Sequence, residues 1–219
     1  MIPGHSGTKE KPQVFGVDYS VYVRIVRLAL AEKSVEYRLV PVDIFAEEGP
    51  LKGYLDRHPF GRIPAFEHAG FSLYETGAIA RYVDDAFEGP RLQPTDIKAR
   101  ARCNQLISIA DNYAYPQLVR GIYVERVSKP RRGVAPDEAK IAATIPKARM
   151  CLKAISDLMG DNPWLAGPCL TLADLYAAPM FDYFLMAPEG KENMQLHANL
   201  AAWWSHITAR PSMTVTSPK

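Results

Sequence analysis

The chain has 219 residues, of which 47% are hydrophobic and 23% are charged, values typical of an ordinary globular protein. A formal net charge of +2 excludes a strongly charged surface and argues against nucleic acid as a partner. No window approaches the roughly 20 apolar residues of a membrane span, and residues 1–13 lack the apolar run of a secretory signal. These features predict a cytoplasmic protein that contacts no membrane.

The three cysteines, at positions 103, 151 and 169, are too widely separated for a redox pair or a zinc-ligand spacing. We expect them to be reduced and mostly buried. The histidines and acidic residues also show no ligand spacing, so the sequence predicts no metal site.

The N-terminal part of the chain alternates between strand and helix patterns. In chain order we expect a strand at 13–16, a helix at 20–33, a strand at 35–42, a broken helical turn at 51–57, hairpin strands at 63–67 and 71–74, and a helix at 75–87. Ser20 is a candidate N-cap for the first helix. The order βαβ followed by ββα is the thioredoxin-like arrangement.

Beyond this part the strand alternation disappears. Residues 89–94 hold two prolines, which predicts a linker. The following pattern predicts helices at 95–127, 136–159, 171–185 and 199–209, with bends at Pro116 and Pro146. We therefore expect four segments: a flexible extension at 1–13, a thioredoxin-like domain at 14–88, the linker at 89–94 and an all-helical domain at 95–219.

One stretch carries most of the functional information: a proline loop and strand ending at Phe66, followed by a second strand and then Glu75-Thr76. A cis bond at Ile63-Pro64 would turn the Ile63 backbone outward as an unpaired strand edge. Glu75 and Thr76 would begin a helix, whose free N–H groups attract an anionic group, while the Glu75 carboxylate receives an ammonium. This combination indicates a site for a small zwitterionic peptide.

The same stretch resembles the glutathione site of the glutathione transferase family. Two further motifs carry the resemblance: Ser20, which follows Val14-Phe15-Gly16-Val17-Asp18-Tyr19 and opens a helix, and Thr171-Leu172-Ala173-Asp174-Leu175. The first resembles the serine-type, phi-like members, and the second resembles the family's capping box. The matches extend from Val14 to Trp204 and imply a thioredoxin-like domain followed by an all-helical domain.

Ser20 is the leading catalytic candidate. A hydroxyl at a helix N-terminus can donate to the glutathione thiolate, and the helix dipole favours the same negative charge. Glutathione, and not serine, would be the nucleophile. The alternative is that Ser20 only caps the helix. Tyr19 and Tyr22 are neighbouring hydroxyls, and packing is the more usual role of such tyrosines.

Other site residues follow from the resemblance. Ile63, Pro64, Glu75 and Thr76 match the glutathione contacts, and Arg62 stands where phi-like members commonly carry a glutamine. The family's His-Lys pair is replaced here by Gly49 and Pro50, so Lys52 is an alternative partner for the glycyl carboxylate. The electrophile pocket is predicted to include Tyr19, Tyr113, Tyr115 and Tyr123, although a core or interface position is the more usual role of tyrosines such as the last three.

Thr171 and Asp174 are expected to form a capping box with a structural role. The resulting interpretation is a cytoplasmic, homodimeric glutathione transferase that uses glutathione as co-substrate and needs no cofactor. Its partners are glutathione and a small hydrophobic electrophile. The alternative is a noncatalytic glutathione-binding or scaffold protein of the same fold. The sequence does not choose among transfer, isomerisation, dehalogenation, peroxide reduction and ether cleavage.

Overall fold

The computed structural model describes residues 10–44 and 52–218. The chain divides into two compact units: the first comprises residues up to Pro90 together with the C-terminal residues from Val215, and the second comprises Arg91–Thr214. Most of the predicted extension, and the predicted Gly49-Pro50 substitution, lie outside the described residues.

The first unit is built on a four-stranded sheet with strand order β2-β1-β3-β4. Its strands are β1 (Gln13–Phe15), β2 (Arg38–Val40), β3 (Ala65–His68) and β4 (Phe71–Tyr74). β1 pairs in parallel with β2 and antiparallel with β3, and β3 pairs antiparallel with β4. This topology confirms the predicted thioredoxin-like arrangement.

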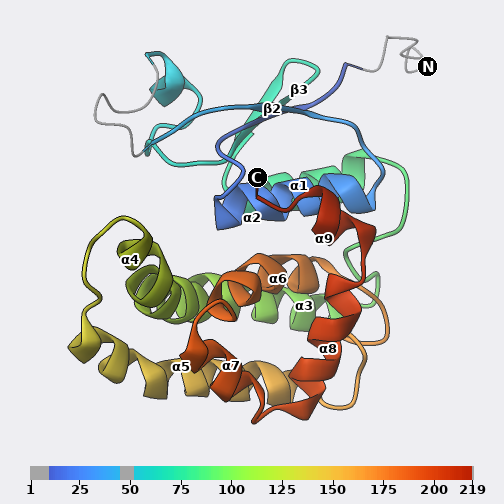
Figure 1. Ribbon diagram of the computed structural model, residues 1–219. Helices are drawn as coiled ribbons and strands as arrows, with labels where there is room; N and C mark the ends of the chain where they lie inside the picture. The colour runs from blue at the N-terminus through green and yellow to red at the C-terminus, as the bar shows by residue number, and fades with distance from the viewer. Residues whose placement is uncertain (1–9, 45–51, 219) are drawn as a thin grey trace. The chain divides into compact units, whose positions relative to one another are not determined.

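Two helices, α1 (Val21–Glu32) and α2 (Thr76–Ala86), lie side by side against the sheet in Figure 1. Their inward positions are fully buried apolar side chains: Val23, Val26, Leu30, Ile79 and Val83. Burying one such side chain contributes roughly 1.5–3 kcal/mol. A short 3-10 helix, η1 (Tyr54–Asp56), lies between β2 and β3 in the sequence.

A buried ion pair joins the ends of these helices. The Lys33 ammonium lies 3.0 Å from Oδ1 of Asp84 and donates to the Pro90 carbonyl oxygen at 3.0 Å. The Lys33 and Asp84 side chains are at most 2% exposed. Because the charges are paired and hydrogen-bonded, the cost of removing them from water is offset.

The prediction of a strand over 35–42 was too long, since the ladder contains only Arg38–Val40. The Val35 N–H donates to the Leu30 carbonyl oxygen at 2.9 Å and therefore completes the end of α1 instead of pairing with a strand. Pro41 has no N–H group and ends the regular ladder.

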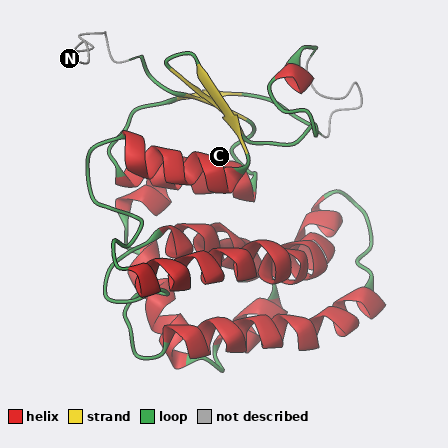
Figure 2. Ribbon diagram, turned by 180° about the vertical axis from the view of Figure 1, so that it is seen from behind, coloured by secondary structure: helices red, strands yellow, loops and turns green. Residues whose placement is uncertain are grey.

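The second unit is helical. Its elements are α3 (Ile97–Ile109), the π-helix η2 (Ala110–Ser128), α4 (Lys129–Arg131), α5 (Glu138–Met159), α6 (Leu172–Phe184), α7 (Pro188–Met194) and α8 (Ala198–Thr208), and α9 (Pro211–Val215) follows. The long helices run alongside one another in Figure 2. The predicted helix at 95–127 is α3 continuing into η2, and the other three predicted helices are α5, α6 and α8.

Asp174, in the first turn of α6, is fully buried. The predicted capping box with Thr171 is present at the start of α6. The two carboxylate oxygens of Asp174 accept four hydrogen bonds, from the Leu165 N–H at 2.8 Å, the Thr171 N–H at 2.7 Å, the Thr171 hydroxyl at 2.9 Å and the Trp203 Nε1–H at 2.9 Å. One carboxylate thus joins the start of α6, the preceding loop and α8.

No helix within residues 10–44 or 52–218 is both long and apolar enough to cross a membrane. All three cysteines are free; Cys103 and Cys151 are buried, while Cys169 is exposed.

Candidate active site

Three segments that the sequence singled out meet at one end of the sheet, where strands β1 and β4 finish and β3 begins. The β1–α1 loop leaves β1 after Phe15, the Ile63-Pro64 loop enters β3 at Ala65, and Glu75 follows β4. Phe15 is paired with Ala65, and Ala65 is paired with Tyr74. Because paired strands lie about 4.8 Å apart, these two pairings bring the three segments together. The Ile63-Pro64 bond is cis, as predicted.

Gly16 allows α1 to pack closely against the Ile63 loop. Its φ is +155°, and a Cβ atom placed there would lie 2.4 Å from Cγ2 of Val23 and 3.3 Å from Cβ of Ile63. The first of these distances is too short for any side chain. A glycine at this position therefore lets the first turn of α1 and the Ile63 loop approach each other.

Ser20 is the N-cap of α1, as predicted. Its Oγ atom accepts a hydrogen bond from the Val23 N–H at 3.4 Å, a long contact. Accepting uses an oxygen lone pair, so the hydroxyl hydrogen can still be donated to a ligand. The loop before Ser20 is held by Arg27, which donates to the Asp18 carbonyl oxygen at 3.4 Å and to the Tyr37 hydroxyl at 2.8 Å.

Tyr19 is a weaker candidate than Ser20. It is 46% exposed, and its hydroxyl donates to Asp43 at 3.5 Å. Burial and the neighbouring Asp43 carboxylate raise the pKa of Tyr19. A phenol with a raised pKa is a poorer hydrogen-bond donor to a thiolate than an unperturbed one.

Glu75 and Thr76 mark the beginning of α2, as predicted. Glu75 has a φ of +71° and is the N-cap, with no side-chain capping hydrogen bond. A left-handed conformation is unfavourable for a residue with a Cβ and is concentrated at functional sites. It leaves the exposed Glu75 carboxylate free of a capping role, while Thr76 is buried at the first turn.

Arg62 and Lys52 are both exposed, and the structure does not choose between them as the partner of a carboxylate. The backbone of Arg62 is fixed, since the Tyr54 hydroxyl donates to its carbonyl oxygen at 2.7 Å. Burial raises the pKa of Tyr54 to about 12, against the opposing effect of a backbone hydrogen bond. Tyr54 therefore remains a neutral donor that holds the loop leading to Ile63.

The structure places His58 in an aromatic cluster next to this loop, a position that no pattern in the sequence indicated. The His58 cluster consists of Tyr54, His58, Phe60 and Tyr74, and His58 is only 2% exposed. An aromatic residue recurs at 54, 58 and 60, but no local spacing links these positions to Tyr74 across the hairpin. The cluster therefore becomes evident only after β3 and β4 are paired.

Three of the four tyrosines predicted for the electrophile pocket, Tyr113, Tyr115 and Tyr123, belong to η2 in the second unit. Tyr113 and Tyr115 are two positions apart and so do not share one face of the helix. Tyr113 is 61% exposed, whereas the ring of Tyr123 packs at 4.3 Å from that of Tyr183. Burial raises the pKa of Tyr123. The predicted pocket role of these residues stays a prediction.

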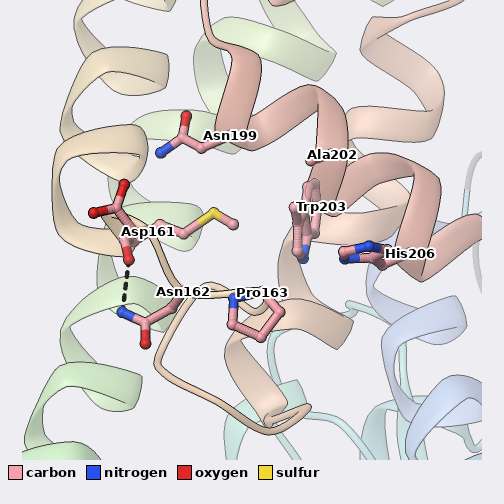
Figure 3. Close-up of a pocket in the computed structure, with 8 residues that line it drawn as sticks. Asp161, Asn162, Pro163, Asn199, Ala202, Trp203 and His206 are labelled. Carbon is pink, nitrogen blue, oxygen red and sulfur yellow. Dashed lines mark hydrogen bonds between the residues drawn. The ribbon is translucent and has the colours of Figure 1, made fainter.

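A cavity of about 360 Å³ opens in the second unit, beside the start of the loop that follows α5. Figure 3 shows its lining, in which the rings of Trp203 and His206 extend from α8 and Pro163 faces them from the loop. None of the predicted site residues lines it. Within the described part of the chain, no group of three or more His, Cys, Asp or Glu side chains could hold a metal ion.

Comparisons with known proteins agree with this geometry. Residues 12–85 match the model for the glutathione S-transferase N-terminal domain, and residues 117–211 match that for the C-terminal domain. Glutathione S-transferase F6 of Arabidopsis thaliana is 31% identical over 202 residues, which cover 91% of this chain and 96% of the relative. The chain belongs to the glutathione S-transferase family.

Solved structures of glutathione S-transferases confirm the predicted fold. Glutathione transferase F7 of Populus trichocarpa superposes with a TM-score of 0.83 at 27% identity, covering 94% of this chain and 97% of that one. A glutathione S-transferase of Methylobacillus flagellatus, solved with GSH bound, has a TM-score of 0.76 at 25% identity and covers 95% and 100% of the two chains. The predicted phi-like family and enzyme class are supported by these relatives.

Proposed function

We propose that this protein catalyses attack of the glutathione thiolate on a hydrophobic electrophile, with Ser20 stabilising the thiolate. The observation that carries the proposal is that the Ser20 helix start, the Ile63-Pro64 loop and Glu75 meet at the same end of the sheet. Glutathione bound here would place its γ-glutamyl end at Glu75 and its cysteinyl thiol near the β1–α1 loop. The glutathione S-transferase names of the relatives support the same reaction.

Each part of glutathione has a proposed partner in this site. The Glu75 carboxylate receives the γ-glutamyl ammonium, and the start of α2 at Thr76 receives the adjacent carboxylate. The backbone of Ile63, ahead of Pro64, pairs with the cysteinyl part. Arg62 or Lys52 pairs with the glycyl carboxylate. The reaction needs no further cofactor, since the thiol of glutathione supplies the nucleophile.

The chemistry at Ser20 is a matter of charge. A thiol with a pKa of about 8.5 is mostly protonated near neutral pH, and only the thiolate attacks an electrophile. A hydroxyl donor and the positive end of the α1 dipole both favour the thiolate. Each pKa unit of lowering requires about 1.4 kcal/mol of differential stabilisation, which one charge-assisted hydrogen bond can supply.

The finer features of the proposal concern the second substrate and the assembly. Tyr19, Tyr113, Tyr115 and Tyr123 are the proposed contacts for the electrophile. A cytoplasmic homodimer with one site per subunit completes the proposal. Light scattering should then give a mass near twice the 24.4 kDa of one chain, and a mass near 24.4 kDa at micromolar concentration would contradict the dimer.

The decisive experiment compares Ser20→Ala with Tyr19→Phe. We expect Ser20→Ala to bind glutathione nearly as tightly as wild type while the pKa of the bound thiol rises by about one unit, a loss of about 1.4 kcal/mol. Turnover with an activated aryl halide should fall about tenfold, and Tyr19→Phe should leave the pKa of the bound thiol unchanged. Thiolate absorbance lost in Tyr19→Phe but kept in Ser20→Ala would move the role to Tyr19.

The same experiment separates the enzyme from a noncatalytic binding protein. Wild-type protein that binds glutathione, shows no thiolate near neutral pH and turns over no electrophile class would support the binding protein. The position of Ser20 at the same end of the sheet as Glu75 favours the enzyme, because a site that only holds the peptide needs no hydroxyl beside its thiol.

A further inference from the structure

Three aromatic rings lie close to the imidazole of His58. Its centroid lies 5.0 Å from that of Tyr74, 6.2 Å from that of Phe60 and 6.5 Å from that of Tyr54. The side chain is buried, and its Nδ1 atom has no hydrogen-bond partner. A buried, unpartnered nitrogen is costly, and protonating it would place a charge among apolar rings.

His58 connects the two halves of the proposed glutathione site. On one side, its N–H donates to the Tyr54 carbonyl oxygen at 3.0 Å and its carbonyl oxygen accepts from the Gly61 N–H at 2.9 Å. These bonds shape the loop that leads to Ile63. On the other side, its ring packs on Tyr74, the residue directly before the strained Glu75. The His58 ring therefore supports both the loop before Ile63 and the turn at Glu75 between β4 and α2.

Two charged side chains, Glu75 and Arg62, act on the pKa of His58 in addition to its burial. Burial lowers the pKa of His58, the Glu75 carboxylate raises it, and Arg62 lowers it. The effect of Glu75 is larger than that of Arg62. The Tyr54 phenol, whose pKa is raised to about 12, is uncharged near neutral pH, and Tyr74 contacts His58 through its ring.

We propose that His58 is a positioning residue whose protonation opposes the binding of glutathione. The inference rests on the proposed function, in which Glu75 pairs with the glutathione ammonium. Glutathione brings an ammonium to Glu75 and carboxylates to Thr76 and to the glycyl end, so its own charges act on His58 in both directions. The packing sets the sign, because an imidazolium would be a buried charge among the rings that hold the loop and Glu75 in place. Protonation therefore disfavours the arrangement that binds glutathione, and by reciprocity bound glutathione weakens proton binding at His58.

The test measures binding of S-methylglutathione by calorimetry from about pH 7.5 to about pH 5, the range in which histidine titrates. The thioether has no ionisable thiol, so thiolate formation at Ser20 does not contribute. We expect the association constant to fall about fivefold over this range, the lower end of usual coupling between sites. Repeating the titration near pH 6 in two buffers of different ionisation enthalpy should show that binding releases protons.

His58→Phe keeps an aromatic ring in the cluster and cannot titrate, so its affinity should be nearly independent of pH. His197→Asn is the matched control, because burial also lowers the pKa of His197, and this variant should keep the wild-type profile. A flat wild-type profile, or a wild-type profile retained in His58→Phe, would overturn the inference. If His58→Phe does not fold, the wild-type proton count decides, and zero release overturns it. Absence of binding at any pH would instead refute the proposed function, and this inference with it.

Discussion

Replacing Asp174 by alanine should strongly destabilise the second unit. The carboxylate is fully buried and accepts hydrogen bonds from two backbone N–H groups, the Trp203 indole and the Thr171 hydroxyl. Alanine offers none of these donors an acceptor. The Thr171 hydroxyl can rotate to another partner, but the three N–H donors are fixed by the backbone and by the packing of Trp203.

The magnitude follows from these three donors. A buried donor that loses its acceptor costs about 1–3 kcal/mol, so Asp174→Ala should lower the free energy of unfolding by at least about 3 kcal/mol. That is a large part of the roughly 5–15 kcal/mol that stabilises a typical domain. Asp174→Asn keeps one acceptor oxygen, which can serve Leu165 and Trp203, and should cost less, about 1–2 kcal/mol.

Urea unfolding followed by tryptophan fluorescence provides the assay. It is best done near pH 8, because burial raises the pKa of Asp174 to about 6 and the carboxylate is ionised above that value. Asp157→Ala is the control, since Asp157 forms an exposed pair with Lys153 and its loss should cost less than about 0.5 kcal/mol. If Asp174→Ala costs less than about 1 kcal/mol, the four hydrogen bonds do not support this unit as argued.

Two further predictions concern other carboxylates. Glu75→Gln should weaken glutathione binding by about 1.5–3 kcal/mol in calorimetry, because it removes the charge that pairs with the ammonium, whereas the exposed Glu88→Gln should have no effect. Burial alone would raise the pKa of Glu125, but hydrogen bonds from Lys129, Lys140 and the Asp137 N–H outweigh it and lower the pKa to about 2. A lowered pKa means that the stability from Glu125 is present above about pH 4.5 and is lost as the pH falls toward 2. Urea midpoints should therefore decline more steeply across this window in wild type than in Glu125→Gln, and parallel declines would contradict the assignment.

The features that the sequence predicted correctly are those that neighbouring residues determine. The Ser20 cap, the Glu75-Thr76 helix start and the Thr171–Asp174 box each depend on residues within one helical turn. The cis Ile63-Pro64 bond was expected from the proline loop before a strand, a pattern that also lies within a few residues. Such local chemistry can be recognised without knowing which segments later meet in space.

The features that were missed depend on distant contacts. The Trp203 indole reaches Asp174 across 29 positions, and the Tyr74 ring reaches His58 only through the β3–β4 hairpin. α7 was missed for a different reason, since its sequence has little apolar periodicity. It is accommodated by Gly190, where a Cβ atom would lie 2.0 Å from the Phe184 carbonyl oxygen. Close packing of this kind leaves only a glycine in the sequence as its signal.

The buried Lys33–Asp84 pair determines where the thioredoxin-like unit can be separated from the rest of the chain. One of the acceptors of Lys33 is the carbonyl of Pro90, which lies beyond the last helix of the sheet unit. A fragment that stops at the end of α2 would keep the ion pair but lose this acceptor, leaving a buried ammonium short of one hydrogen bond. Fragments or domain exchanges between family members should therefore place the junction after Pro90, even though the regular secondary structure ends at Ala86.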